Sequence, residues 1–180
     1  MYKKGRFKLL MKLLSLSKDL KEKKLKDYIV KNKESFYKIA YSYVKNEYDA
    51  LDIVHDAICK ALSKIDTLKD MDNIKPWFYK ILINTTTDYI RKNKKYIVVS
   101  DDVLEDSKID YDKYNDIDLL RAVDSLDEIY KTVIILRYFE DMKIEDIAKT
   151  LDQNISTIKT RIYKALSKLK IKIDIKREDG

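Results

Sequence analysis

The chain has 180 residues and a net charge of +7, with only two Gly, one Pro, one Cys and one His. So few turn-forming residues disfavour an all-β or α/β fold of this length and favour helices. The composition also provides no nucleophile–base pair and no phosphate-cradling loop, which argues against an enzyme, a cofactor and a metal site. Cys59 has no second cysteine to pair with, and we expect it to be a buried free thiol.

Charge is distributed unevenly along the chain. Residues 1–33 contain twelve Lys or Arg and three acids, whereas residues 100–118 contain eight acids and two Lys. The basic balance favours a polyanionic partner, either nucleic acid or an anionic membrane surface. No apolar run is long enough to span a membrane and no signal-peptide cleavage site follows the basic start, so we expect a cytoplasmic protein.

The first predicted element is a basic N-terminal extension at residues 1–24. Leucines recur there at helical spacing, with Lys residues between them, which predicts an amphipathic helix. Three interpretations stay open: a helix that packs on the first domain or on a partner, a partly disordered segment, or a helix that contacts a membrane surface. Met11 is an alternative start of the chain.

A first helical domain is predicted at residues 25–96. From Leu25 onward, apolar residues recur in steps of three and four, the spacing of one buried helix face. A second helix is predicted to begin at Asp49, whose side chain can cap it. Residues 66–75 are polar and predict a loop, after which a third helix begins near Pro76, since proline is tolerated in a first turn.

The acidic residues 97–118 hold no helical pattern and are predicted to form a flexible linker. A second domain follows at residues 119–172, with a tail at residues 173–180. Within it, Ser125 and Glu128 have the spacing of a capping box and predict the start of a helix. The predicted fold is therefore all-α, with two small helical domains and a helix-turn-helix in the C-terminal one.

The helix-turn-helix is predicted from two short helical patterns that begin at Ile144 and Ile155 with a tight corner between them. Asn154 can cap the second helix, and Ile155, Ile158 and Ile162 are expected to face the core. The opposite face is polar and basic, as a DNA major groove requires. Its candidate DNA-binding residues are Ser156, Thr157, Lys159, Thr160, Arg161 and Lys164. The alternative is a solvated face on a structural helix.

The stretch from Leu126 to Leu151, followed by residues 156–165, resembles region 4 of the sigma-70 superfamily. In that family the second helix of the pair reads the promoter −35 element, so the resemblance implies this role for the same six residues. One position departs from the family pattern. The family often has Gly at the turn, where this chain has Asp152, which tolerates a left-handed backbone less well than Gly but better than most residues.

A second resemblance lies in the first domain, where residues 49–56 are similar to the helix of sigma region 2 that docks on the coiled coil of the polymerase β′ subunit. The polymerase-binding residues that it implies are Asp49, Asp52, His55 and Asp56. His55 stands where the family usually has Gln, so a neutral hydrogen-bonding role is expected. The alternative is a capped helix with a solvated acidic face.

Residues 77–84 and 88–91 resemble the family segment that melts and reads the −10 element. Unstacked bases need polar or aromatic pockets and nearby cations. The −10 residues implied are Lys80, Asn84, Asp88, Arg91, Lys92, Lys94 and Lys95. The loop at residues 66–75 is where the family captures a flipped base, whereas Trp77 is expected to be a buried core indole rather than a base-stacking one.

Regions 2 and 4 in this order, with no long domain between them, are similar to the extracytoplasmic-function (ECF) sigma factors. The resemblance implies a non-catalytic factor that binds core RNA polymerase through its β′ and β subunits and directs initiation on promoter DNA. It also implies an anti-sigma factor, often membrane-anchored in the family, that would hold this protein at the membrane. The alternative is a helix-turn-helix regulator that does not act as a polymerase subunit.

Overall fold

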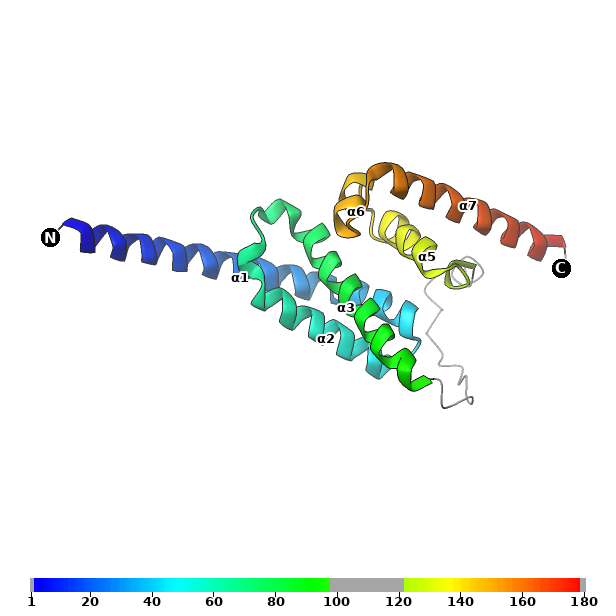
Figure 1. Cartoon of the computed structure of the whole chain (residues 1–180), viewed down its shortest axis with the longest axis horizontal. Helices are drawn as coiled ribbons and strands as arrows, with labels where there is room; N and C mark the ends of the chain where they lie inside the picture. The colour runs from blue at the N-terminus through cyan, green and yellow to red at the C-terminus, as the bar shows by residue number, and fades with distance from the viewer. Residues whose placement is uncertain (1, 98–121, 179–180) are drawn as a thin grey trace.

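The structure is a computed structural model that describes the backbone of residues 2–97 and 122–178, and the side chains of residues 18–93 and 122–170. Every regular element in these ranges is helical, which confirms the predicted all-α fold, and the helices form two groups (Figure 1). The first group consists of α1 (Tyr2–Val44), α2 (Glu47–Ser63), η1 (Ile65–Thr67), η2 (Met71–Asn73) and α3 (Ile74–Ile97). The second consists of α5 (Glu128–Ile134), the π-helical segment η4 (Ile135–Phe139), α6 (Ile144–Thr150) and α7 (Ile155–Glu178). Apart from its first residue, the predicted linker lies outside the described residues.

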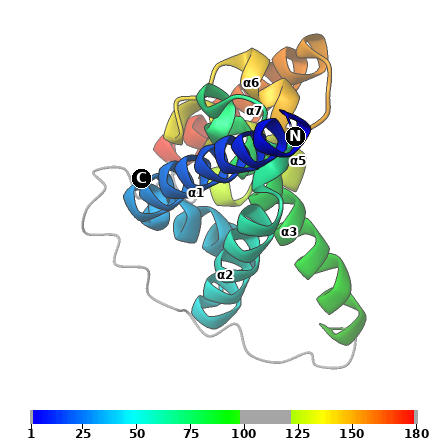
Figure 2. The same ribbon diagram turned by 90° about the vertical axis from the view of Figure 1, so that its left-hand side faces the viewer.

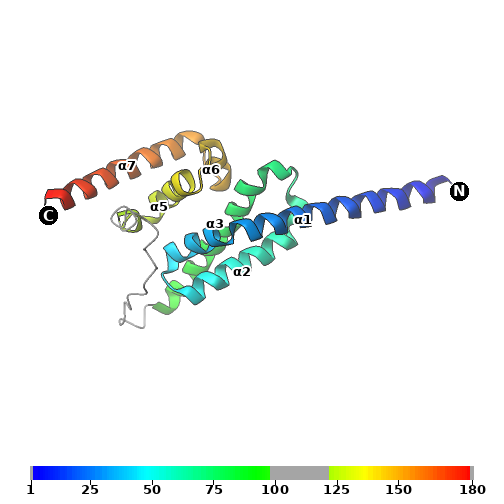
Figure 3. The ribbon, with the colours of Figure 1, turned by 180° about the vertical axis from the view of Figure 1, so that it is seen from behind.

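Helix α1 is continuous over 43 residues, so the basic start of the chain runs without a break into the first group. Its N-terminal part extends past the ends of α2 and α3 (Figures 1 and 3). The described tertiary contacts of α1 begin where the Lys18 ammonium lies 3.5 Å from the Asp66 carboxylate and that of Lys21 donates to the Leu68 carbonyl at 2.8 Å. The side chains of residues 1–17 lie outside the described part, and the three interpretations of the extension therefore stay open.

The core of the first group is rich in aromatic rings. Phe36 of α1 and Phe78 and Tyr79 of α3 are fully buried, and the ring centroids of Phe36 and Phe78 lie 4.3 Å apart. Tyr28 packs edge-on against Phe78, with the centroids 6.0 Å apart. Aromatic pairs in such tilted or edge-on arrangements add attraction beyond their buried area. This cluster holds α3 against α1 and determines which side of α3 faces outward.

The corner between α1 and α2 corrects the predicted helix start. Lys45 ends α1 with a left-handed φ of 55°, and Asn46 caps α2 by accepting a hydrogen bond from the Asp49 backbone N–H at 3.0 Å. Helix α2 therefore begins at Glu47, two residues before the predicted start. The prediction was wrong because Asn46 and Asp49 are both good capping residues, and spacing alone does not distinguish them.

The second group has an aliphatic core. Val133, Leu136, Ile147 and Ile158 are fully buried where α5, η4, α6 and α7 meet. The predicted helix-turn-helix is present as α6 and α7, with four residues between them. Unlike the core of the first group, which includes fully buried aromatic rings, this core is filled mainly by aliphatic side chains.

The capping box predicted at Ser125 is wrong. Helix α5 begins at Glu128, and Asp127 stands at its N-cap without a side-chain capping bond. The Ser125 hydroxyl instead donates to the Ala122 carbonyl at 2.7 Å, at the end of a helical turn over residues 122–124. Serine hydroxyls bond readily to preceding carbonyls, and this local bond competes with capping.

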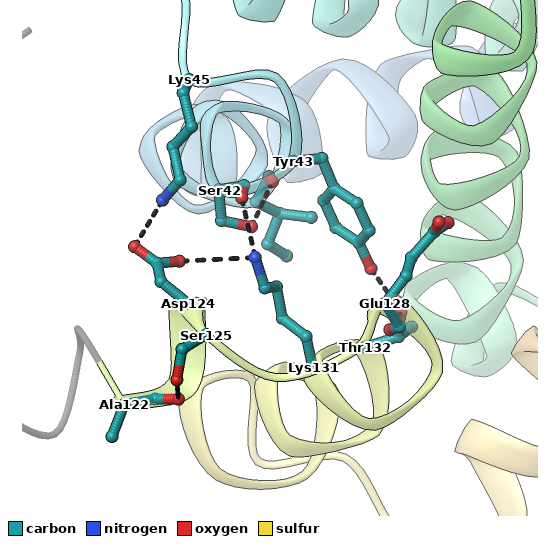
Figure 4. Close-up of polar contacts among 10 residues, drawn as sticks. Ser42, Tyr43, Lys45, Ala122, Asp124, Ser125, Glu128, Lys131 and Thr132 are labelled. Carbon is teal, nitrogen blue, oxygen red and sulfur yellow. Dashed lines mark hydrogen bonds and ion pairs between the residues drawn. The ribbon is translucent and has the colours of Figure 1, made fainter. Parts of the chain in front are cut away.

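The two groups pack against one another. Helix α6 contacts α3, and the start of the second group lies at the C-terminal end of α1 (Figures 2 and 4). The hydrogen bonds that join the groups include one from the Thr150 hydroxyl to the Pro76 carbonyl, at 3.2 Å. The helix-turn-helix is thus held against the helix that carries the predicted −10 residues.

Candidate nucleic-acid and protein interfaces

Helix α7 begins with a side-chain cap. The Asn154 side-chain oxygen accepts hydrogen bonds from the Thr157 backbone N–H at 2.8 Å and from the Ser156 and Thr157 hydroxyls, each at 2.7 Å. Asparagine caps of this kind stabilise a helix by about 1 kcal/mol. The predicted cap is confirmed, and it fixes two of the predicted −35 side chains at the helix end where backbone N–H groups favour a phosphate.

The predicted −35 residues all lie on the side of α7 that faces away from the core. Ile158, Ile162 and Ala165 line the buried side. The exposed residues of the predicted set are Ser156, Lys159, Thr160 and Lys164, and the half-buried ones are Thr157 and Arg161. This surface is therefore cationic and rich in hydroxyl groups, which suits contacts with phosphates and base edges.

Ile155 was predicted to face the core, but its side chain is 42% exposed. A helical side chain leans towards the N-terminus of its helix and covers the preceding turn. Ile155 is the first residue of α7 and has no preceding turn to cover. The periodicity that places Ile158 and Ile162 inside therefore does not apply at this helix end.

The turn before α7 has the backbone that the family glycine would adopt. Asp152 has a left-handed φ of 50°, a conformation that Asp tolerates better than most non-glycine residues. Its carboxylate lies 2.6 Å from the Lys80 ammonium of α3. The residue that departs from the family pattern thus also connects the two helical groups.

The four predicted polymerase-binding residues lie along one side of α2. Asp52, His55 and Asp56 are exposed, and Asp56 pairs with Lys60 one turn later at 2.8 Å. Asp49 is half-buried and accepts a hydrogen bond from the Tyr89 hydroxyl of α3 at 2.6 Å. This bond, more than burial, raises the pKa of Tyr89. Asp49 therefore fixes the face to α3 while the other three residues point into solvent.

Two large apolar side chains belong to the same face of α2. Tyr48 is 81% exposed and Leu51 is 56% exposed, each directly beside an acidic residue in the chain. Large exposed apolar side chains among charged ones are typical of protein contact surfaces. The sequence held a signal for them, because both fall outside the buried stripe that passes through Ala50, Ile53 and Ala57.

The prediction that Cys59 is buried is wrong. Its side chain is exposed, and its sulfur lies 3.9 Å from the His55 ring nitrogen Nε2 one turn earlier. On a helix with 3.6 residues per turn, Cys59 stands opposite the buried stripe of α2. The helical phase of Cys59 therefore outweighs the general tendency of free thiols to be buried.

The predicted −10 residues lie along α3. Those whose side chains are described are Lys80, Asn84, Asp88, Arg91 and Lys92. Arg91 lies 2.9 Å from Asp88 one turn earlier, and Lys80 is engaged by Asp152. Asn84 and Lys92 are exposed, whereas the side chains of Lys94 and Lys95 lie outside the described residues. Part of this surface is thus paired with carboxylates of the protein itself.

The segment before α3 is more ordered than the predicted loop. It contains η1 and η2, and Trp77 is half-buried against it, with its indole N–H donating to the Thr67 hydroxyl at 3.2 Å. The expected core position of Trp77 is therefore only partly observed. The indole supports this segment, which borders the predicted −10 surface.

Neither a metal cluster nor a membrane span is found where the structure is described. Among those residues, no group of three or more His, Cys, Asp or Glu side chains could hold a metal ion. No helix in the described ranges combines the length and the apolar character that crossing a bilayer requires.

Two family models match the chain. The model described as Sigma-70 region 2 matches residues 28–96, and the model described as Sigma-70, region 4 matches residues 116–169. Together they account for more than half of the chain, and each corresponds to one helical group.

Curated proteins of the same kind are similar over most of their length. The chain is 49% identical over 146 residues to the RNA polymerase sigma factor SigV of Bacillus subtilis, covering 81% of this chain and 88% of SigV. It is 29% identical to the ECF RNA polymerase sigma factor SigW of the same organism, covering 77% of this chain and 82% of SigW.

Among solved structures, the sigma factor RpoE of Bartonella quintana, crystallised with the anti-sigma factor NepR, is similar with a TM-score of 0.70. Its sequence is 26% identical, and the match covers 83% of this chain and 96% of RpoE. CnrH, solved with the cytosolic domain of CnrY, has the same fold, with a TM-score of 0.62 at 20% identity over 84% of this chain and 88% of CnrH.

Proposed function

The chain belongs to the ECF sigma factors of the sigma-70 family, and we propose that it binds core RNA polymerase and directs transcription initiation at specific promoters. One observation carries this function: a single chain combines an acidic and apolar face on α2, a cationic α3 and a helix-turn-helix. A regulator that only binds DNA would need the helix-turn-helix alone. The alternative function therefore leaves α2 and α3 without a role.

The three surfaces divide the work. The α2 face, with Asp52 and His55 beside Tyr48 and Leu51, docks on the polymerase β′ coiled coil through charge and apolar contact together. Region 4 also contacts the β subunit. Helix α7 reads the −35 element, with its cations on phosphates and its hydroxyls near base edges. Helix α3 binds the −10 strand and aids its opening, because its cations lie along the phosphate backbone of the separated strand.

We further propose that the chain is not an enzyme. Its side chains bind and orient DNA and protein, and phosphodiester bond formation stays with the polymerase. The protein works in the cytoplasm until an anti-sigma factor sequesters it. Such anti-sigma factors are often membrane-anchored in this family. The exposed apolar side chains on α2, together with Tyr138 and Phe139 of η4, offer contact area for such a partner.

The test is run-off transcription with purified bacterial core RNA polymerase on a promoter library with randomised −35 and −10 elements. We expect the chain to bind core polymerase and to select a promoter class. Asp52→Lys should abolish polymerase binding but leave binding of region 4 to DNA intact. Arg161→Ala with Lys164→Ala should do the opposite. DNA binding without polymerase binding or initiation would contradict the proposal and establish the helix-turn-helix regulator instead.

A further inference from the structure

The connection between α2 and α3 passes beside α1, where α1 continues beyond the other helices (Figures 1 and 3). We call residues 65–73 the η segment, because they comprise η1, η2 and the three residues between them. Between the two helical turns the backbone is extended, with φ −77° and ψ 101° at Leu68 and φ −131° and ψ 126° at Asp70. Extended backbone does not satisfy its own polar groups, so its position depends on partners from neighbouring elements.

Two side chains from neighbouring helices hold the η segment. The Lys21 ammonium of α1 donates to the Leu68 carbonyl at 2.8 Å. The Trp77 indole N–H of α3 donates to the Thr67 hydroxyl at 3.2 Å, and that hydroxyl donates to the Lys64 carbonyl at 2.7 Å. Consecutive residues of the segment are therefore held from two different helices.

The bond from Lys21 is the stronger of the two links between α1 and the η segment. Lys18 lies 3.5 Å from Asp66, but both side chains are more than half exposed, and solvent weakens such pairs. Lys21 is half-buried, and it donates to the carbonyl of Leu68, whose side chain is buried in the core. A hydrogen bond from a charged donor is stronger than a neutral one, and leaving such a carbonyl without its donor is costly.

The exposed side of the η segment differs in charge from the cationic surface of α3 that it borders. Its exposed residues are Asp66, Thr67, Lys69, Asp70 and Asp72. Three carboxylates against one ammonium repel phosphates, so this segment cannot follow the DNA backbone as the cations of α3 do. Its hydrogen-bonding groups can instead approach the edge of an unpaired base. The Asp70 carboxylate also fixes the local shape, since it accepts from the Asp72 backbone N–H at 3.0 Å and from the Asn73 side chain at 3.1 Å.

We propose that Lys21 and Trp77 are positioning residues for −10 selection. They fix the η segment beside α3, so that an unpaired base of the −10 strand meets one set of hydrogen-bonding groups. A fixed binding surface discriminates between bases, whereas a mobile one adapts to several of them. The inference rests on the proposed function and deepens it, because it assigns part of the promoter preference to a residue of α1 that does not touch DNA.

The first test measures base preference. Run-off transcription with purified core polymerase uses a promoter library that has the −35 element selected by the wild-type chain and a randomised −10 element. Lys21→Met keeps the length of the side chain and removes its ammonium. We expect discrimination between bases to fall about threefold to tenfold in one part of the −10 element, with the preference elsewhere retained. Lys21→Arg keeps a charged donor and should keep the preference.

Lys23→Met is the matched control, because Lys23 is exposed on the same helix and its replacement removes the same charge. It should leave the base preference as it is. Thr67→Val removes the acceptor of the Trp77 indole and keeps the side-chain shape, so it should weaken the same preference by a smaller factor. An unchanged preference in Lys21→Met, or an equal loss in Lys23→Met, would overturn the proposal. An unchanged preference in Thr67→Val would overturn the role of Trp77.

A second measurement separates positioning from stability. The Leu68 amide donates to the Ile65 carbonyl at 3.1 Å, and its hydrogen exchange should accelerate in Lys21→Met. The urea midpoint of the helical signal and the affinity for core polymerase should stay as in the wild type. Transcription that falls by the same factor for every −10 sequence would show that Lys21 only stabilises region 2, and would overturn the proposal. Failure of the wild-type chain to bind core polymerase and initiate would instead contradict the proposed function.

Discussion

Regions 4 and 2 present their candidate DNA-binding side chains in different ways. On α7, Lys159 and Lys164 are exposed and project from a helix whose opposite side is buried. On α3, Lys80 is paired with Asp152 of the other region, and Arg91 is paired with Asp88. The predicted −35 surface is therefore largely exposed in this structure, whereas part of the predicted −10 surface is paired with carboxylates of the protein itself. Promoter binding should begin at region 4.

The cores of the two regions differ as well, and the largest expected effect tests this difference. Phe78→Ala removes a fully buried ring that contacts Phe36 and Tyr28, and should destabilise region 2 by about 3–5 kcal/mol. Trp77, the one tryptophan of the chain, reports on region 2. We expect the variant to show its Trp77 fluorescence transition at a lower urea concentration than the wild type. At that concentration region 4 should still retain its helical structure.

Leu136→Ala is the control in region 4, where it empties a fully buried aliphatic position. It should cost about 2–5 kcal/mol in region 4 and move the Trp77 transition much less. If both variants shift both unfolding transitions equally, the two regions unfold as one unit and their cores are not separately stable.

Arg161→Ala with Lys164→Ala tests two cations of the predicted −35 surface in region 4, the half-buried Arg161 and the exposed Lys164. We expect affinity for a −35 duplex to fall between about tenfold and a hundredfold. The slope of log affinity against log salt concentration should decrease by about 2, since each lost phosphate contact removes close to one released counterion. Fluorescence anisotropy over a range of salt concentrations measures both quantities.

Lys168→Ala is the matched control on the same helix. Its ammonium lies 2.6 Å from the Asp127 carboxylate and 4.6 Å from the centre of the Tyr130 ring, so it is engaged within the protein. This variant should leave the salt slope as it is. A slope that is unchanged in the double variant would remove Arg161 and Lys164 from the phosphate contacts.

Alkaline pH tests the aromatic core of region 2. Burial, and after it the negative charge of Glu140, raises the pKa of Tyr28, and burial with the Glu140 hydrogen bond raises that of Tyr79. Above about pH 10 the unfolded chain loses these protons before the folded chain does. Stability should therefore be complete below pH 10 and fall above it by about 1.4 kcal/mol per pH unit for each tyrosine.

Urea titrations between pH 9 and pH 11 measure this slope, and Tyr79→Phe should reduce it by the share of one tyrosine. The same slope in wild type and variant would show that the Tyr79 hydroxyl ionises in the folded chain as it does in water. The outcome separates a buried hydroxyl that stabilises region 2 from one that only fills space.

Much of the fold could be predicted from the sequence, because helical periodicity and caps are local signals. Asn154 and the core positions Ile158 and Ile162 follow from spacing alone. The sequence predictions are wrong where two possible capping residues compete, or where the apolar periodicity reaches the end of a helix. Asn46 displaced Asp49 as a cap, and Ile155 has no preceding turn to cover.

The contacts between the regions could not be predicted, because they join residues far apart in the chain. Nothing near Lys80 in the sequence indicates Asp152, and nothing near Tyr79 indicates Glu140. Tyr48 is a different case. Its exposure is predictable from the sequence, because its helical phase places it outside the buried stripe of α2.

The smallest expected effect compares the helix caps of the two regions. Asn46→Ala and Asn154→Ala each remove a side-chain oxygen that accepts a backbone N–H in the first turn of a helix, at 3.0 Å and 2.8 Å. Each change should cost about 1 kcal/mol of stability in its own region. Their functional effects should differ, because Asn46 positions the α2 face and Asn154 positions the α7 surface.

We expect Asn154→Ala to weaken binding to a −35 duplex severalfold with little change in affinity for core polymerase, and Asn46→Ala to do the reverse. Asn154 should have the larger functional effect of the two, since it also orders the Ser156 and Thr157 hydroxyls of the predicted DNA surface. Anisotropy with DNA and with labelled core polymerase measures the pair of affinities for each variant. Equal losses of both affinities in both variants would mean that the caps act only through global stability, and that the two surfaces are not positioned separately.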